Sequence, residues 1–135
     1  MSHFSTIQTK IKDYDVLVKA LNNLGQEVTG NNQELVVSGA HGKGHETVVA
    51  DIAIGTDIGF RYSTVSQTYE LVTDLHTWDQ PVPVERFLDK LAQEYSLVYI
   101  KSQAEKDGYE IVEEKRELDG SVELVVTRWT SDGDN

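Results

Sequence analysis

The chain has 135 residues, the length of one ordinary domain, and its 23 acidic against 12 basic residues give a formal charge of −11. This charge argues against nucleic acid and anionic membrane surfaces as partners, because affinity for polyphosphate comes mainly from Lys and Arg. The absence of cysteine excludes disulfides and thiol catalysis, and without an apolar run near 18 residues no membrane span is predicted. A basic protein partner fits the charge, although solubility alone would also explain it.

The first 25 residues predict a strand that runs into a capped helix. Alternation from Phe4 onward indicates a strand over roughly the first twelve residues, and we expect the fold to start at the N-terminus with no leader before it. Asp13 is suited to be the N-cap of a helix over 14–24, and Gly25 supplies the stop.

The middle of the chain predicts only strands. The candidates are 26–29, 33–38, 47–54, 60–65 and 68–75. Their connections are too short for crossovers, so we expect antiparallel pairing. Asp51 lies inside the apolar strand predicted over 47–54, where it would face the wet side of the sheet or, alternatively, a ligand.

A loop around Trp78 then leads into a second helical region, from residue 83 or 84 to about 106. Because residues 95–100 are rich in β-formers, we expect a kink, a break or a new helix there. Gly108 ends the region, and Asp119-Gly120 between two alternating runs predicts a hairpin of strands 109–117 and 122–129. The predicted buried face of the helix holds Phe87, Leu88, Leu91 and Tyr95.

The element order predicts an α+β fold: a strand, a helix, four or five strands, a second helix and two strands. The two main helices should pack on one face of a mostly antiparallel sheet. We expect a single domain over 1–129 and a frayed acidic tail over 130–135.

One candidate metal site stands out. His41 and His45 are four residues apart with Glu46 beside them, and imidazole with carboxylate could hold zinc or another divalent metal. Glycines lie between the two histidines, however, so the segment is predicted to be a loop in which this spacing has little geometric force. A loop that merely tolerates histidine is the alternative.

A candidate ligand site combines Asp51, His76 and Trp78, and Asp57 and Asp74 are further carboxylates that could take part in acid–base chemistry. No set of residues has the pattern of a catalytic site, and no nucleophile elbow is present. The glycines precede strands rather than helices, so they match no dinucleotide fingerprint, and no cofactor is expected.

Several segments in chain order resemble the hypothetical chloroplast reading frame thirty-five family. They are MSHFSTI at 1–7, ADIAI at 50–54, DIGF at 57–60 and YELVTD at 69–74, followed by the run 87–95 and the closing 120–129. This family occurs in cyanobacteria and in some algal plastid genomes. The resemblance implies a cytoplasmic or stromal protein of a photosynthetic lineage, and it transfers no reaction and no catalytic residues.

We therefore expect a non-enzymatic accessory or protein-interaction module. Its partner should be a protein rather than nucleic acid, without membrane insertion, and a homodimer is left open. The alternative is a small-molecule-binding protein or an unrecognised enzyme with a pocket near Asp51, His76 and Trp78.

Overall fold

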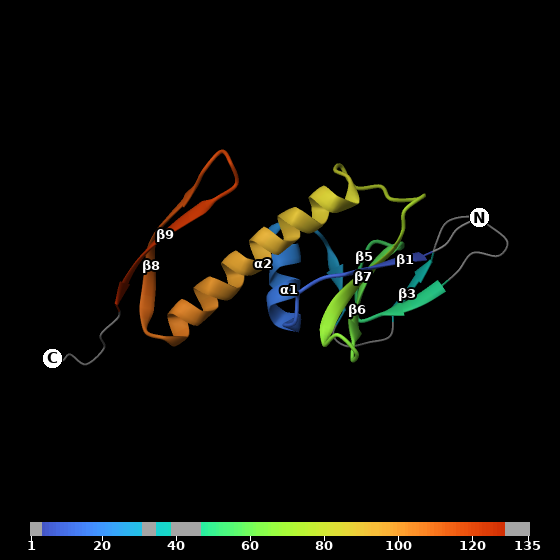
Figure 1. Cartoon of the computed structure of the whole chain (residues 1–135), viewed down its shortest axis with the longest axis horizontal. Coiled ribbons are helices and arrows are strands. Elements are labelled where there is room, and N and C mark those ends of the chain that lie inside the picture. Colours follow the sequence, from blue (N-terminus) through green and yellow to red (C-terminus); the bar gives the residue numbers. More distant parts are fainter. Residues whose placement is uncertain (1–3, 31–34, 39–46, 129–135) are drawn as a thin grey trace. The chain divides into compact units, whose positions relative to one another are not determined.

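A computed structural model of the chain describes residues 4–30, 35–38 and 47–128 (Figure 1). The chain forms two compact units, Met1–Tyr95 and Ser96–Asn135. Their boundary falls inside one helix, α2 (Val84–Lys106). The expectation of a single domain over 1–129 stays a prediction. No helix in the described ranges is long and apolar enough to cross a membrane.

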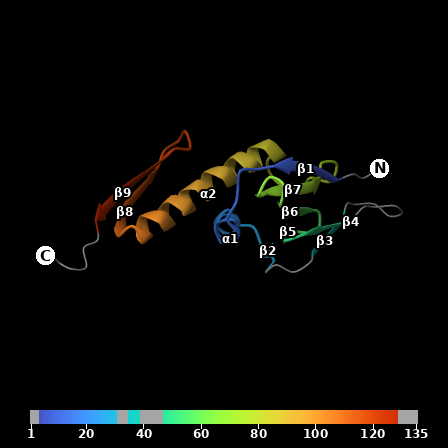
Figure 2. The same cartoon turned by 60° about the horizontal axis from the view of Figure 1, so that its bottom comes forward.

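The first unit is built on an antiparallel sheet of five strands in the order β1-β7-β6-β5-β2, which Figure 2 shows from one margin to the other. A separate ladder joins β3 and β4. The predicted α+β class is confirmed. The strands are β1 (Phe4–Gln8), β2 (Val28–Thr29), β3 (Leu35–Ser38), β4 (Thr47–Ala50), β5 (Ile52–Ile54), β6 (Ile58–Ser63) and β7 (Thr68–Asp74).

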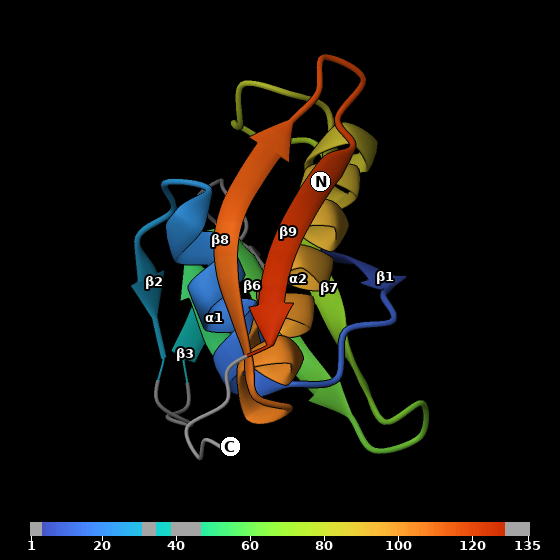
Figure 3. The ribbon, with the colours of Figure 1, turned by 90° about the vertical axis from the view of Figure 1, so that its left-hand side faces the viewer.

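An apolar layer covers one face of the sheet, and a separate core cluster consists of Ala50 and Ala53 with Phe4 packed against it. Residues directly opposite in an antiparallel pair share a face. Phe60 pairs with Leu71 and with Ile52, and Ile58 pairs with Ile54, so these side chains form one apolar layer. All five are buried. Helix α1 (Tyr14–Asn23) and the first turns of α2 lie side by side over the sheet (Figure 3).

Helix α1 forms as the sequence predicts. The Asp13 side chain accepts a hydrogen bond from the Val16 N–H at 3.0 Å, which satisfies one of the free amides of the first turn. Gly25 follows the last turn with a φ of +86°, a conformation that glycine adopts without strain. Leu17, Ala20 and Leu21 recur at helical spacing and are fully buried.

Two hydrogen bonds fix the first part of α2 beside α1. The Asn23 amide donates to Glu94 Oε2 at 3.0 Å. The Tyr95 hydroxyl accepts from the Asp13 N–H at 3.0 Å, at the point where the chain enters α1. These two hydrogen bonds hold the first part of α2 against α1.

The strand predicted over 47–54 is divided at Asp51, so six described strands stand between the two helices instead of four or five. The Asp51 N–H donates to the Phe60 carbonyl at 2.9 Å, and its carboxylate accepts from the Tyr62 N–H at 2.7 Å. The Asp51 carboxylate therefore takes the place of a backbone carbonyl of a partner strand opposite Tyr62. The alternation of apolar and polar residues in the sequence does not reveal such a hydrogen bond.

The expected kink or break at 95–100 is wrong, because α2 continues without interruption for 23 residues. Phe87, Leu91, Glu94 and Val98 are all buried at helical spacing across the segment. Burial at this spacing outweighs the β-forming composition, since most helical stability in proteins comes from packing of one face.

The second unit holds the rest of α2 and a hairpin of β8 (Tyr109–Arg116) and β9 (Val122–Arg128). The predicted hairpin is confirmed. Asp119 accepts a hydrogen bond from the Ser121 N–H at 2.9 Å, and Gly120 has a φ of +94°. A bulge interrupts the ladder between Ile111 and Glu113.

We predict that Asp51 stabilises the fold through its carboxylate, which accepts the hydrogen bond from the Tyr62 N–H. Asp51→Ala should lower the free energy of unfolding by about 1–2 kcal/mol, because the Tyr62 N–H loses a charged acceptor. Asp51→Asn keeps an acceptor oxygen and should lose less than half as much. Urea unfolding of both variants measures this, and equal losses would contradict the assignment.

Candidate functional site

The predicted metal ligands His41 and His45 lie outside the described residues, so the metal site stays a prediction. Within 4–30, 35–38 and 47–128, no group of three or more His, Asp or Glu side chains could hold a metal ion.

The structure places Asp51 and His76 toward opposite ends of the sheet. Asp51 bonds to Tyr62, which pairs with Tyr69 near the start of β7, whereas His76 follows the end of that strand. The five residue steps from Tyr69 to Asp74 correspond to about 17 Å of strand. Asp51 and His76 therefore lie in two different regions of the sheet. Whether either binds a ligand stays a prediction.

The first region, which we call the Asp74 turn, consists of residues 74–78 together with Asp57. Asp74 Oδ1 accepts from the His76 N–H at 2.9 Å, and the Asp74 carbonyl accepts from the Thr77 N–H at 3.1 Å. The Thr77 hydroxyl donates to Asp57 Oδ2 at 2.9 Å, and the Thr73 hydroxyl donates to the Asp57 carbonyl at 3.0 Å. The loop between β5 and β6 is thereby tied to the end of β7.

His76 and Trp78 differ in their surroundings within this turn. The His76 side chain is exposed. Trp78 is half-buried, its indole N–H donates to the Val82 carbonyl at 2.8 Å, and its ring meets that of Phe87 edge-on with centroids 5.4 Å apart. The polar group of Trp78 is thus already engaged in closing the loop before α2, which is a structural role.

Asp74 is the unusual residue of the turn, because it is fully buried and its second oxygen, Oδ2, has no hydrogen-bond donor within the described part of the chain. Buried polar atoms are nearly always paired, since leaving one unpaired costs free energy. From the sequence alone, Asp74 is only one of several carboxylates that could take part in acid–base chemistry. A strand-end aspartate looks like an ordinary turn residue, and its burial depends on distant contacts.

The second region, the tyrosine cluster, consists of Tyr14, Tyr62 and Tyr69 with Asp51. The rings of Tyr62 and Tyr69 meet edge-on at 5.3 Å, and those of Tyr14 and Tyr69 lie 6.4 Å apart. Burial, and next the negative charge of Asp51, raise the pKa of Tyr69 from 10.0 to about 12. Tyr69 is therefore protonated at neutral pH and suited to donate a hydrogen bond rather than to act as a base.

The tyrosine cluster was not predicted from the sequence, although part of its signal was present there. The turn at residues 64–67 places Tyr62 opposite Tyr69 once the strands 60–65 and 68–75 are paired. The contribution of Tyr14 could not be anticipated, because it depends on how α1 crosses the sheet.

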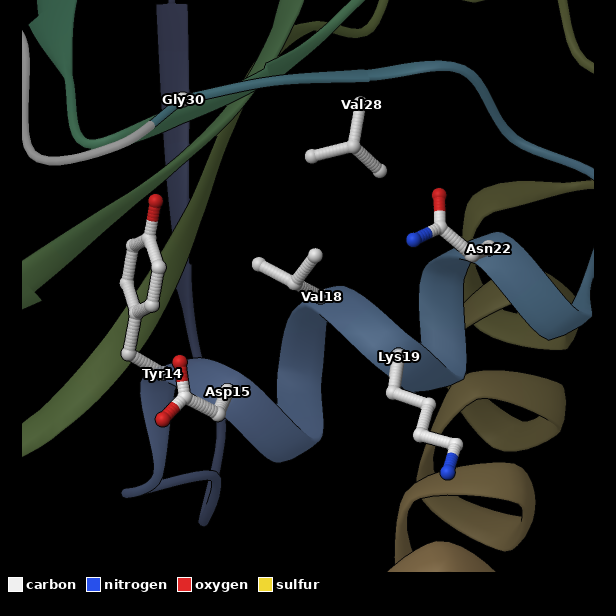
Figure 4. A pocket seen from close by; sticks show the side chains of 7 residues that line it. All are labelled: Tyr14, Asp15, Val18, Lys19, Asn22, Val28 and Gly30. Atoms are coloured by element: carbon white, nitrogen blue, oxygen red, sulfur yellow. The ribbon is translucent and has the colours of Figure 1, made fainter.

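A groove runs beside the tyrosine cluster, between α1 and β2 (Figure 4). Its volume is about 300 Å³, at the lower end of the range for small-molecule sites. A Cβ atom at Gly30 would meet the Tyr14 hydroxyl at 2.8 Å and the Asp51 carbonyl at 3.2 Å, so a side chain there would displace the Tyr14 hydroxyl. The groove is lined by Tyr14, Asp15, Val18, Lys19, Asn22, Val28 and Gly30.

The raised pKa of Tyr69 predicts a stability loss in alkali. Above pH 10 an unfolded tyrosine loses its proton, whereas Tyr69 in the fold keeps it up to about pH 12, so the free energy of unfolding falls through this interval. Tyr69→Phe should therefore lose less stability between about pH 8 and about pH 11 in urea unfolding. The matched control is Tyr99→Phe, at a tyrosine that is 45% exposed, and it should behave like the wild type. An unchanged alkaline loss in Tyr69→Phe would contradict this role.

The bonded oxygen of Asp74 predicts unequal effects for two substitutions. Asp74→Asn keeps the acceptor for the His76 N–H, so it should lower the free energy of unfolding by about 1 kcal/mol or less. Asp74→Ala removes the acceptor and should lower it by about 2 kcal/mol. Thermal and urea unfolding distinguish the two. A loss in Asp74→Asn as large as in Asp74→Ala would contradict the role of Oδ1 as the acceptor that holds the turn.

Comparison with known proteins places this arrangement in a family. A family model described as "Protein of unknown function (DUF1257)" matches residues 20–125. The chain is 39% identical over 133 residues to the "Uncharacterized protein ycf35" of Pyropia yezoensis, covering 96% of this chain and 98% of the relative. The proteins of the same name from Cyanophora paradoxa and Guillardia theta are 38% and 37% identical with the same coverage. No solved structure matches the chain. The chain therefore belongs to this family of proteins of unknown function, as its resemblance to the hypothetical chloroplast reading frame thirty-five family indicated.

Proposed function

We propose that this protein is a non-catalytic accessory module that binds another protein through the β8–β9 hairpin. The observation that carries the proposal is Val125, which is 39% exposed on one face of a sheet of only two strands. Val112, at the bulge, is 56% exposed, and Val126, on the face opposite to Val125, is 42% exposed. A two-stranded hairpin is at best marginally stable alone, and exposed apolar side chains on it favour association with a further surface.

The charges around Val125 indicate the chemistry of the partner. Glu113 lies directly opposite Val125 in the ladder, and Glu123 is two residues away on the same face. Glu110 also shares this face, and Lys115 is its one basic residue among those that the ladder pairs. An apolar residue within an acidic rim is complementary to a basic surface that offers an apolar contact. The charge of −11 agrees with such a partner.

Relatives in photosynthetic lineages support a place for this module in such cells. We propose that it acts in the cytoplasm of a cyanobacterium or in a plastid stroma, in the assembly or regulation of a photosynthetic or redox complex.

Small-molecule binding is the second candidate. The 300 Å³ groove beside α1 supports it, although Asp51 is not one of the residues that line the groove. A compound that raises the melting temperature of the wild type, but not that of a groove variant such as Val18→Trp, would favour this function.

The experiment for the main proposal is a pull-down with the full chain from a native extract of a photosynthetic organism, at several salt concentrations. We predict one stoichiometric, basic protein partner whose recovery falls as salt rises. Val112→Ser and Val125→Ser should each weaken the binding of this partner about tenfold. Each substitution removes an apolar side chain that would be buried at the interface.

The matched control is Val65→Ser, since Val65 is 94% exposed in the first unit, away from the hairpin in sequence. It should bind like the wild type. Recovery of no partner at any salt concentration, or equal weakening by the control, would contradict the proposal.

A further inference from the structure

A pocket of about 470 Å³, which we call the α2–β8 pocket, lies in the second unit where α2 ends and β8 begins. Figure 1 shows this place as the turn between the long helix and the first strand of the hairpin. The volume falls in the range of sites that bind small molecules or single side chains. The lining residues are Glu105, Tyr109, Glu110 and Ile111.

The turn at Gly108 brings these residues together. The Gly108 N–H donates to the Glu105 carbonyl at 3.1 Å, and Gly108 has a φ of +86°, which glycine adopts without strain. The chain therefore leaves α2 in a tight turn and enters β8 at Tyr109, close to Glu105. Tyr109 and Ile111 are two residues apart in the strand, so their side chains share one face.

The two acidic residues of the pocket have no cationic partner in the part of the chain that the structure describes. Two other glutamates of the hairpin are paired with lysine or arginine, whereas Glu105 and Glu110 form no ion pair among the described residues. Between residues 105 and 111, three acidic side chains accompany one basic side chain, Lys106. The last six residues of the sequence hold two aspartates and no basic residue, so they supply no cation. The charge therefore favours a cation as the ligand of the pocket.

The chemistry of Tyr109 favours a guanidinium group over an ammonium group. Arg128 lies opposite Tyr109 in the ladder, with its guanidinium carbon 5.4 Å from the ring centroid, and it donates to the Tyr109 hydroxyl at 3.0 Å. Arg128 does not line the pocket, so its charge does not fill it. A planar guanidinium can stack on an aromatic ring and donate to two carboxylates at once, whereas an ammonium is a compact point charge.

We propose that the α2–β8 pocket receives an arginine side chain of the basic partner protein, and this inference rests on the proposed function. The guanidinium group would bind the carboxylates of Glu105 and Glu110, and the methylene groups of the arginine would pack against Tyr109 and Ile111. Glu110 also lies on the hairpin face that holds Val125, so the pocket is continuous with the surface proposed for the partner.

The probe that tests the pocket is Nα-acetyl-arginine amide, which presents arginine as it occurs within a protein chain. NMR titration of the full chain should show saturable shifts of the Tyr109, Glu110 and Ile111 amides, with a dissociation constant on the order of 1–10 mM. The lysine derivative should bind more weakly. The citrulline derivative has a similar shape but no charge, and it should give no saturable shifts. Equal binding of the citrulline derivative would overturn the proposal, because the pocket would then not recognise the charge.

Two substitutions test the acidic residues. Glu105→Gln and Glu110→Gln each remove one carboxylate at nearly constant size, and each should weaken binding of the probe about threefold. The double variant should bind about tenfold more weakly. The matched control is Glu117→Gln, seven residue steps from Glu110 and so about 23 Å away along the extended chain. This control should bind the probe like the wild type, and equal weakening there would show general attraction to an acidic chain instead of a pocket.

Free arginine tests whether the guanidinium comes from a small molecule. The acidic residues of the pocket repel the carboxylate of free arginine, so it should bind more weakly than the blocked derivative. Tighter binding of free arginine would identify a small-molecule site and overturn the proposal.

The titration and the pull-down distinguish this inference from the proposed function. With a recovered basic partner, the double variant of Glu105 and Glu110 should weaken the complex about tenfold. Unchanged binding of the partner, or absence of probe binding, would overturn the arginine contact and leave the proposed function intact. Probe binding without any recovered partner would contradict the proposed function and, with it, the partner as the source of the arginine.

Discussion

The register between β6 and β7 is the constraint on which the first unit depends. It pairs Phe60 with Leu71 and Tyr62 with Tyr69, which places the apolar side chains of both strands under α1. A shift by one residue would turn this layer outward, because side chains alternate between the two faces of a strand. The same register orients the backbone of β7 and so decides which groups of β1 bond inward and which remain at the margin. The core and the hydrogen-bonding phase of β1 are therefore two results of one pairing.

An aspartate lies near each end of this ladder, and the two carboxylates differ in their hydrogen bonding. Near the Tyr62 end, the carboxylate of Asp51 substitutes for a strand that has ended, and its charge contributes to the raised pKa of Tyr69. At the other end, Asp74 uses one buried oxygen to hold the turn, while the second has no donor within the described residues. A carboxylate retained in such a position lowers stability, and proteins often keep such features where function requires them. The Asp74 turn is thus a better candidate for a functional constraint than the exposed His76 beside it.

The sequence predicted the elements that depend on neighbours in the chain. Asp13 and Gly25 define α1, and Asp119-Gly120 defines the β8–β9 turn, because caps and turns need only a few local residues. The division at Asp51 and the continuity of α2 through residues 95–100 were not predictable in this way, since both are decided by packing against distant strands or helices. The separation of Asp51 from His76 was not predictable for the same reason, because it follows from the register and not from their spacing in the chain. His41 and His45 lie outside the described residues, so the metal site remains a prediction from the sequence.

Electrostatics limits what the proposed hairpin surface can bind. The face of the hairpin around Val125 carries Glu110, Glu113 and Glu123, so attraction to a basic partner there is screened by salt. Two copies of a chain with a net charge of −11 repel each other where acidic residues meet, so the same face disfavours a second copy of this chain. The acidic residues around Val125 therefore favour a basic partner and oppose self-association through one and the same interaction.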